Sequence, residues 1–172
     1  MADNADAFAR TAYLITRDLS EAEDLVQETL IRVARRWGRV GSMDHPAAYA
    51  RRILVNLALD AADVRVRHRE ELGYTAHSLD AHADERATGE LVAVQNRSEL
   101  GWALAALPRQ QRAVMVLRYW EDLPEAEVAE ILGCSIGTVK KATWRGAIRL
   151  RETLVGTASP LSGVTANGGN RS

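Results

Sequence analysis

Five cationic side chains lie close together near the C-terminal end of this 172-residue chain. Between residues 133 and 151 they are not interrupted by any carboxylate: Lys140, Lys141, Arg145, Arg149 and Arg151. Such a cluster is typical of a surface that binds the phosphates of a nucleic-acid backbone. The whole chain is nearly neutral, with 22 basic and 23 acidic residues, so the positive charge is local. The alternative is a solvated basic face on a helical bundle.

A second pattern, Gly133-Cys134-Ser135-Ile136-Gly137, matches G-x-S-x-G, the nucleophile elbow of serine hydrolases. That elbow requires a strand before the serine, whereas residues 125–132 have the apolar periodicity of a helix. Ser135 is better explained as the N-cap of the helix that follows it. We therefore expect no enzyme activity, and a helical hydrolase that uses Ser135 stays an alternative.

Metal and cofactor chemistry finds little support in the sequence. His77, Asp80, His82 and Asp84 are close in sequence, but they lie where apolar periodicity fails, so we expect solvated loop residues. The single cysteine, Cys134, excludes a disulfide and any multi-cysteine metal site. We expect no metal and no cofactor.

The elements that position these residues are predicted to be helices, since apolar residues recur at helical period and no segment alternates like a strand. A Ser20–Glu23 capping box predicts a helix over 20–38 that ends at Gly38. Its expected apolar stripe is Ala22, Leu25, Val26, Thr29, Leu30, Val33, Ala34 and Trp37. A shorter helix is expected upstream, and Pro46 begins another that runs to about Arg69.

The C-terminal part has the pattern of a helix-turn-helix. We expect one helix ending at Pro108, a second from Pro108 through Trp120, and a short third over 124–132. The turn Gly133-Cys134-Ser135 then leads into a helix from Ile136 to about Leu154. Its expected inner residues are Val139, Thr143, Gly146 and Leu150, and its expected outer residues are Gly137, Lys141, Trp144 and Arg145.

These patterns predict an all-α protein of two small helical domains. The expected boundaries are residues 1–70 and 95–155, joined by a flexible acidic linker over 71–94 and followed by a disordered tail over 156–172. No apolar run approaches the ~20 residues that cross a bilayer. The acidic start of the chain is unlike a secretion signal, so we expect a cytoplasmic protein without membrane insertion.

Two sets of motifs resemble a known family. Ala22-Glu23-Asp24-Leu25-Val26-Gln27-Glu28 and the segment over residues 49–58 resemble region 2 of bacterial sigma factors. The segments over 103–112 and 132–140 resemble region 4. Their order and spacing are similar to the extracytoplasmic-function (ECF) group of the sigma-70 family, in its SigE-like actinobacterial branch. The resemblance covers about residues 6–155.

The resemblance implies a promoter-specificity subunit that binds core RNA polymerase, at the β′ clamp and the β flap, together with the −10 and −35 promoter elements. The residues implied for polymerase docking are Asp24, Leu25, Gln27, Glu28 and Arg32, with Arg35 nearby. Those implied for the −10 element are Tyr49, Arg51, Arg52, Asn56 and Arg65. Those implied for the −35 element are Ser135, Gly137, Thr138, Lys140, Lys141, Trp144, Arg145 and Arg149. The question of an anti-sigma partner stays open.

The chain departs from the family at its recognition helix. Ala142 stands where an Arg or Gln is expected, and Trp144 stands where a small or polar residue is common. Lys141 and Trp144 predict an altered promoter preference, so no family promoter consensus is transferred. A free-standing helix-turn-helix regulator that works without polymerase is the other alternative.

Overall fold

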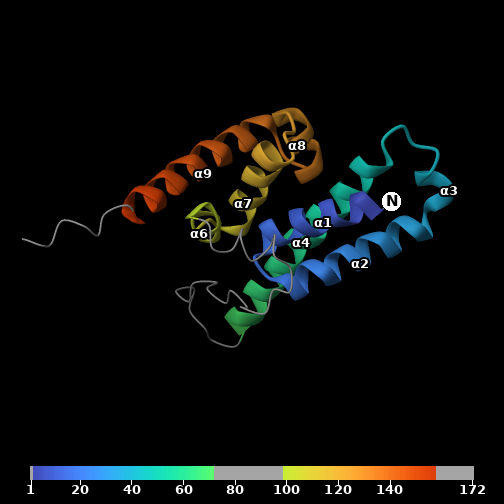
Figure 1. Cartoon of the computed structure of the whole chain (residues 1–172), viewed down its shortest axis with the longest axis horizontal. Coiled ribbons are helices and arrows are strands. Elements are labelled where there is room, and N and C mark those ends of the chain that lie inside the picture. Colours follow the sequence, from blue (N-terminus) through green and yellow to red (C-terminus); the bar gives the residue numbers. More distant parts are fainter. Residues whose placement is uncertain (1, 72–98, 158–172) are drawn as a thin grey trace, which may run out of the picture.

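The computed structural model describes residues 2–71 and 99–157, and the side chains within 5–61 and 99–155. Every regular element in these ranges is helical, as the sequence predicts (Figure 1). The predicted linker and tail lie largely outside the described residues, as do His77, Asp80, His82 and Asp84. The boundaries chosen for the two domains stay predictions.

The N-terminal unit consists of α1 (Ala2–Thr16), α2 (Leu19–Arg35), α3 (Trp37–Val40) and α4 (Pro46–Glu71). Helices α1, α2 and α4 pack against one another around a core of aliphatic side chains. The largest fully buried members of this core are Ile15, Val40, Leu54 and Val55. Pro46 begins α4, as predicted, because its fixed φ suits the first helical turn.

Helix α2 begins and ends earlier than its sequence predicts. Asp18, not Ser20, is the N-cap, since its carboxylate accepts a 2.9 Å hydrogen bond from the Glu21 N–H. The helix ends at Arg35 and the short α3 follows, so Gly38 is not its stop. The predicted stripe is correct for Ala22, Leu25, Val26, Thr29 and Val33. It is wrong for three others, which are exposed: Leu30, Ala34 and Trp37.

The C-terminal unit consists of α6 (Glu99–Ala105), α7 (Arg109–Met115), the π-helix η1 (Val116–Trp120), α8 (Glu125–Leu132) and α9 (Ile136–Thr157). The single helix predicted from Pro108 through Trp120 is therefore two elements. In a π-helix each N–H bonds the carbonyl five residues earlier, whereas in an α-helix it bonds the carbonyl four residues earlier. In η1 the Glu121 N–H donates to the Val116 carbonyl at 3.0 Å. The extra residue per turn rotates the end of η1, and Trp120 is half exposed there.

The two units pack against each other in the part of the chain that the structure describes. Helix α1 contacts α7 and η1, and α4 contacts α7 and α8. In Figure 1, α9 lies along the upper edge of the molecule and α2 along the opposite side. None of the described helices is long and apolar enough to cross a membrane.

Candidate nucleic-acid and protein interfaces

The helix-turn-helix predicted from the sequence is present in α8, the turn after it, and α9. Gly133 takes the left-handed conformation, with φ +62°, which glycine adopts without the strain that a Cβ causes. The Cys134 N–H then donates to the Ala129 carbonyl at 3.0 Å and closes the end of α8. Ala129 and Val139 are buried where the two helices meet, and Val139 is fully enclosed. The angle between α8 and α9 is therefore fixed by packing.

Ser135 caps α9, as predicted. Its Oγ accepts from the Thr138 N–H at 3.1 Å and lies 2.9 Å from the Thr138 hydroxyl. The serine hydroxyl thus stabilises the first turn of α9, and the element before it is a helix and not a strand. Both facts argue against the nucleophile elbow. Cys134 is free and partly buried, and no group of residues in the described ranges could hold a metal ion.

The outer face of α9 is open to solvent along its first three turns. The exposed residues there include every predicted one: Ser135, Gly137, Thr138, Lys140, Lys141, Trp144 and Arg145. The Trp144 side chain is 66% exposed. Lys140 makes a loose ion pair with Glu125 at 3.8 Å. This surface combines cations with an exposed aromatic ring, a combination suited to a nucleic-acid groove.

Arg149 differs from the other cations of α9, although it too is exposed. Its guanidinium donates to the Gln111 side chain of α7 at 3.2 Å. The rise of 1.5 Å per residue puts Arg149 about 13 Å along the helix from Lys140, more than the ~12 Å width of a major groove. Arg149 and Arg151 thus lie farther along α9 than the cations of its first three turns, and the contact of Arg149 with DNA stays a prediction.

The predicted docking face of α2 is only partly on the surface. Asp24 and Gln27 are exposed, and Glu28 pairs with Arg32 at 2.7 Å on the next turn. Leu25, in contrast, is 8% exposed and belongs to the core. Leu25 packs α2 against the bundle, and the polar residues form the outer face, so the contact of Leu25 with core polymerase stays a prediction.

The predicted residues of α4 occupy different environments. The Tyr49 hydroxyl accepts from Arg36 at 3.0 Å, which fixes the phenol at the start of the helix. Arg52 is exposed and Asn56 is partly exposed. Arg51 is turned inward, where its Nε lies 2.9 Å from the Glu121 carboxylate. Arg65 lies in the last part of α4, outside the residues whose side chains are described.

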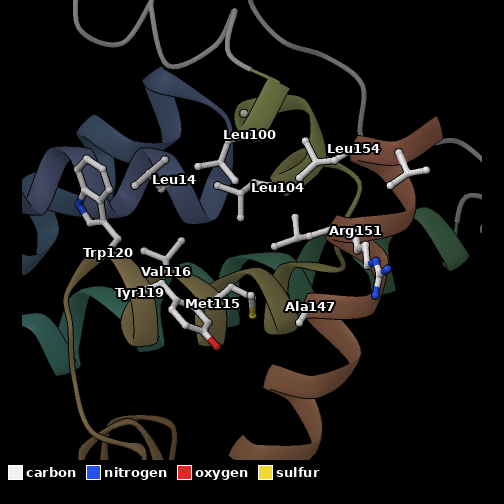
Figure 2. A pocket seen from close by; sticks show the side chains of 13 residues that line it. Leu14, Leu100, Leu104, Met115, Val116, Tyr119, Trp120, Ala147, Arg151 and Leu154 are labelled. Carbon is white, nitrogen blue, oxygen red and sulfur yellow. The ribbon is translucent and has the colours of Figure 1, made fainter. Parts of the chain in front are cut away.

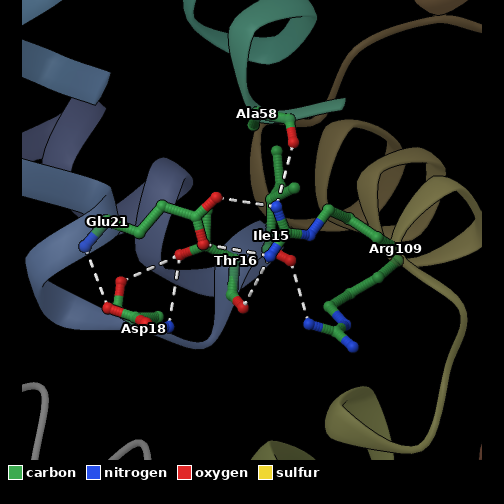
Figure 3. A network of polar contacts seen from close by, with 7 residues as sticks. Ile15, Thr16, Asp18, Glu21, Ala58 and Arg109 are labelled. Atoms are coloured by element: carbon green, nitrogen blue, oxygen red, sulfur yellow. Dashed lines mark hydrogen bonds and ion pairs between the residues drawn. The ribbon is translucent and has the colours of Figure 1, made fainter. Parts of the chain in front are cut away.

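Sequence reasoning missed the polar contacts that join the two units. Figure 3 shows Arg109 of α7 reaching between α1, α2 and α4. It donates to both oxygens of Glu21, at 2.8 and 3.0 Å, and to the Ala58 carbonyl at 3.1 Å. Arg112, which is 4% exposed, donates to the Ile15 carbonyl at 2.9 Å. Two arginines at a spacing of three, just after Pro108, were the available signal, but their partners in the N-terminal unit lie 51 to 97 residues away.

Glu121, which follows η1, makes a second contact between the units. Its carboxylate accepts a hydrogen bond from the Thr11 hydroxyl of α1 and pairs with Arg51 of α4. Arg51 also lies 3.9 Å from Glu127 of α8. The side chains of Arg51 and Glu121 are 21% and 13% exposed, so water screens this pair only in part.

An apolar groove of about 530 Å³ lies between α6, η1 and α9, with α1 at one side. Its lining is almost entirely aliphatic and aromatic, and Figure 2 shows Leu14 of α1 near Leu100 and Leu104 of α6. Leu100 is half exposed on this groove. Arg151 stands at the α9 side. Such a concave apolar surface suits the apolar side chains of another protein segment.

The end of α1 holds two groups whose titration is perturbed. Burial raises the pKa of the Tyr13 phenol, and burial also lowers the pKa of Arg17. The Arg17 guanidinium lies 5.0 Å from the centre of the Tyr13 ring, in cation–π contact. Arg17 has φ +61°, and this left-handed residue directs the chain from α1 into α2.

Two family models match the chain. The model of sigma-70 region 2 matches residues 1–69, and the model of sigma-70 region 4 matches residues 97–150. The first therefore covers the N-terminal unit, and the second covers most of the C-terminal unit with the helix-turn-helix.

Among curated proteins, the RNA polymerase sigma-E factor of Streptomyces avermitilis is 36% identical over 149 residues, which cover 87% of this chain and 79% of that protein. The ECF RNA polymerase sigma factor SigL of Mycobacterium tuberculosis is 31% identical, over 88% of this chain and 85% of that one. Among solved structures, the sigma factor RpoE of Bartonella quintana, crystallised with the anti-sigma factor NepR, superposes with a TM-score of 0.65 at 26% identity. That superposition covers 88% of this chain and 92% of the solved one.

Proposed function

Because this chain belongs to the ECF group of the sigma-70 family, it is an RNA polymerase sigma factor that directs promoter-specific initiation, and we propose how its surfaces divide that work. In this proposal α2 binds core polymerase, α4 binds the −10 element and α9 binds the −35 element. The observation that carries the proposal is the pair of open polar faces on different units, one on α2 and one on α9.

Helix α9 is assigned to the −35 element because its first three turns are exposed, cationic and capped. The Ser135 cap leaves further N–H groups of the first turn free for a phosphate, at the positive end of the helix dipole. Lys141 and Arg145 extend from the same face as Trp144. An Arg or Lys can bind guanine edges, and an aromatic ring can pack on a thymine methyl group. We assign base contacts to Lys141 and Trp144, and backbone contacts to Lys140.

Helix α4 is assigned to the −10 element. Tyr49 offers an aromatic ring held by Arg36, Arg52 offers an exposed cation, and Asn56 offers an amide that can bond a base edge. A base taken out of the stack requires both a stacking partner and polar contacts to its edge. The proposed surface supplies both kinds of group.

Helix α2 is assigned to the β′ clamp of core polymerase, through Asp24, Gln27 and the Glu28–Arg32 pair. The apolar groove between α6, η1 and α9 is assigned to the β flap, since its lining suits the side chains of a partly apolar segment. Two contacts of different chemistry, one polar and one apolar, then hold the two units to the same enzyme.

The remaining parts of the proposal follow from the family. Sigma factors are not themselves catalysts, and the engagement of Ser135 in the α9 cap supports the same conclusion for this chain. Because RNA polymerase transcribes in the cytoplasm of bacteria, we place this chain there as well. The Bartonella structure makes an anti-sigma factor a candidate partner here as well.

Transcription in vitro tests the proposal. Core polymerase is supplied with a pool of genomic templates, with and without this chain, and the RNA 5′ ends are sequenced. We expect new start sites, preceded at a constant distance by shared −10 and −35 sequences. A Lys141→Ala variant should use the same −10 sequence with a relaxed −35 preference at one position. Equal initiation with and without the chain would refute the assignment, and a free-standing regulator would fail to co-purify with core polymerase.

A further inference from the structure

The end of α2 and the short α3 form a cationic surface with an exposed indole, to which the proposed function gives no role. Residues 29–43 contain four arginines and no carboxylate. Three of these arginines, Arg35, Arg36 and Arg39, are exposed. Trp37 belongs to the apolar stripe predicted from the sequence, yet it is 47% exposed. These four residues are called the α3 patch below.

The helix dipole explains only part of the α3 patch. Cations in the last turn of a helix stabilise its negative end, and this accounts for Arg35 at the end of α2. It does not account for Arg39, which lies in α3, or for the exposed ring of Trp37. An exposed indole gains free energy when a flat apolar group covers it. Cations for phosphates beside a ring for base stacking are the two features that bind single-stranded nucleic acid.

The Trp37 indole is held in position by its contact with Gly41. A Cβ at residue 41 would lie 3.4 Å from Cε2 and 3.5 Å from Nε1 of the indole, and 3.0 Å from the Trp37 carbonyl oxygen. Glycine at this position therefore lets the ring pack against the backbone. The Gly41 N–H also donates to the Trp37 carbonyl at 2.7 Å. A ring that is already positioned loses less conformational freedom when a base stacks on it.

The α3 patch continues directly into the surface of α4 that is assigned to the −10 element. Arg36 joins the two, because its guanidinium donates to the Tyr49 hydroxyl at 3.0 Å. Trp37 is the next residue, and its Cα is about 3.8 Å from that of Arg36. In Figure 1, α3 and the start of α4 lie at the same end of the N-terminal unit. A strand that reaches Tyr49 therefore has the indole within reach of a neighbouring nucleotide.

We propose that the α3 patch binds the single DNA strand of the melted promoter, with one base stacked on Trp37 and phosphates bound by Arg36 and Arg39. This inference rests on the proposed function and adds contact residues to it. Charge favours DNA over a protein partner for this patch. The docking face of α2 carries Asp24 and Glu28, so the polymerase surface that complements it is cationic and would repel three arginines.

The first test removes the ring. Holoenzyme assembled from core polymerase and this chain is titrated against a fluorescent single-stranded oligonucleotide that carries the non-template −10 sequence of a promoter mapped by transcription. Loss of one base–aromatic stack corresponds to about a 5- to 150-fold loss of affinity, and we expect a loss in this range for Trp37→Ala. Trp37→Phe keeps a ring and should lose less. Trp102→Ala removes an indole that is 63% exposed on α6, and this matched control should leave the affinity unchanged.

The second test identifies the stacked base and counts the phosphate contact. Oligonucleotides with an abasic site at each position in turn are titrated with the same holoenzymes. One abasic site should weaken the unaltered holoenzyme as much as Trp37→Ala does, and it should not weaken the Trp37→Ala holoenzyme further, since one stack is lost only once. Arg39→Gln should reduce the slope of log affinity against log salt by about 0.7, the value for one phosphate of a single strand.

Three results would overturn the proposal. The first is an equal affinity of the Trp37→Ala and unaltered holoenzymes, and the second is an abasic scan in which every site weakens both by the same factor. The third is a Trp37→Ala chain that keeps its circular dichroism but fails to co-purify with core polymerase, because the patch would then be a protein contact. If Trp37→Ala loses that dichroism, Trp37→Phe carries the same comparisons.

The two levels of the argument fail separately. Normal transcription by the unaltered chain, without coupling between Trp37 and any base, would remove the role of the α3 patch and leave the sigma-factor assignment intact. Absence of transcription by the unaltered chain would remove the assignment itself.

Discussion

The salt dependence of promoter binding provides a quantitative test of the α9 surface. Five cations in this part of the sequence could each displace a counterion from DNA. The structure reduces this number, because Arg149 bonds Gln111 and Arg151 stands at the apolar groove. Lys140, Lys141 and Arg145 remain on the open face and span only about 7.5 Å along the helix, which fits within the ~12 Å major groove.

Three neutralised phosphates predict a slope of about −2.7 for log affinity against log salt, whereas five would give about −4.5. Between 50 and 200 mM salt the affinity should then fall about 40-fold and not about 500-fold. Fluorescence anisotropy of a labelled duplex that carries the −35 element, titrated with the chain at several salt concentrations, measures the slope.

Single substitutions then identify the cations that contribute. Lys141→Gln should reduce the slope by about 0.9, and the double variant Arg149→Gln with Arg151→Gln should leave it unchanged. A slope near zero would remove the electrostatic role of α9. A slope near −4.5 that the double variant lowers by about 1.8 would show that the whole helix lies on DNA, and the geometric argument would then be wrong.

Three further predictions concern docking, the cap and the buried phenol. Asp24→Arg with Glu28→Arg should abolish co-purification with core polymerase by reversing the α2 face, while Asp44→Arg with Glu130→Arg, which changes net charge equally at other exposed sites, should not. Ser135→Ala should lower the free energy of unfolding by about 1 kcal/mol in a denaturant titration, through loss of the α9 cap, and ester turnover that disappears in this variant would revive the hydrolase alternative. Because burial raises the pKa of Tyr13 above the value of 10.0 in the unfolded chain, stability is fully present below pH 10 and should fall as the pH rises toward the folded pKa. Tyr13→Phe should flatten that fall in thermal unfolding curves recorded across this range, and an unchanged slope would contradict the assignment.

Local patterns in the sequence predicted most of the helices, because helix periodicity, caps and turns depend on neighbouring residues. The Ser135 cap, the turn at Gly133 and the buried Val139 all follow from a few adjacent positions. The errors in the helix bounds occurred where two nearby residues could each cap a helix, or where the type of helix changes along the chain. Asp18 lies two residues before Ser20 and caps α2 in its place, and the helix predicted from Pro108 through Trp120 is divided into α7 and η1.

The sequence by itself therefore determined the all-helical fold, the helix-turn-helix and the family. Only the tertiary structure decided which residues of each helix are free to act. Leu25 is in the core, Arg51 faces Glu121, and Arg149 faces Gln111. Each of these outcomes depends on a partner that is distant in sequence or on another helix. Contacts between residues that are distant in sequence depend on how whole helices pack, and the spacing of residues along one helix does not predict them.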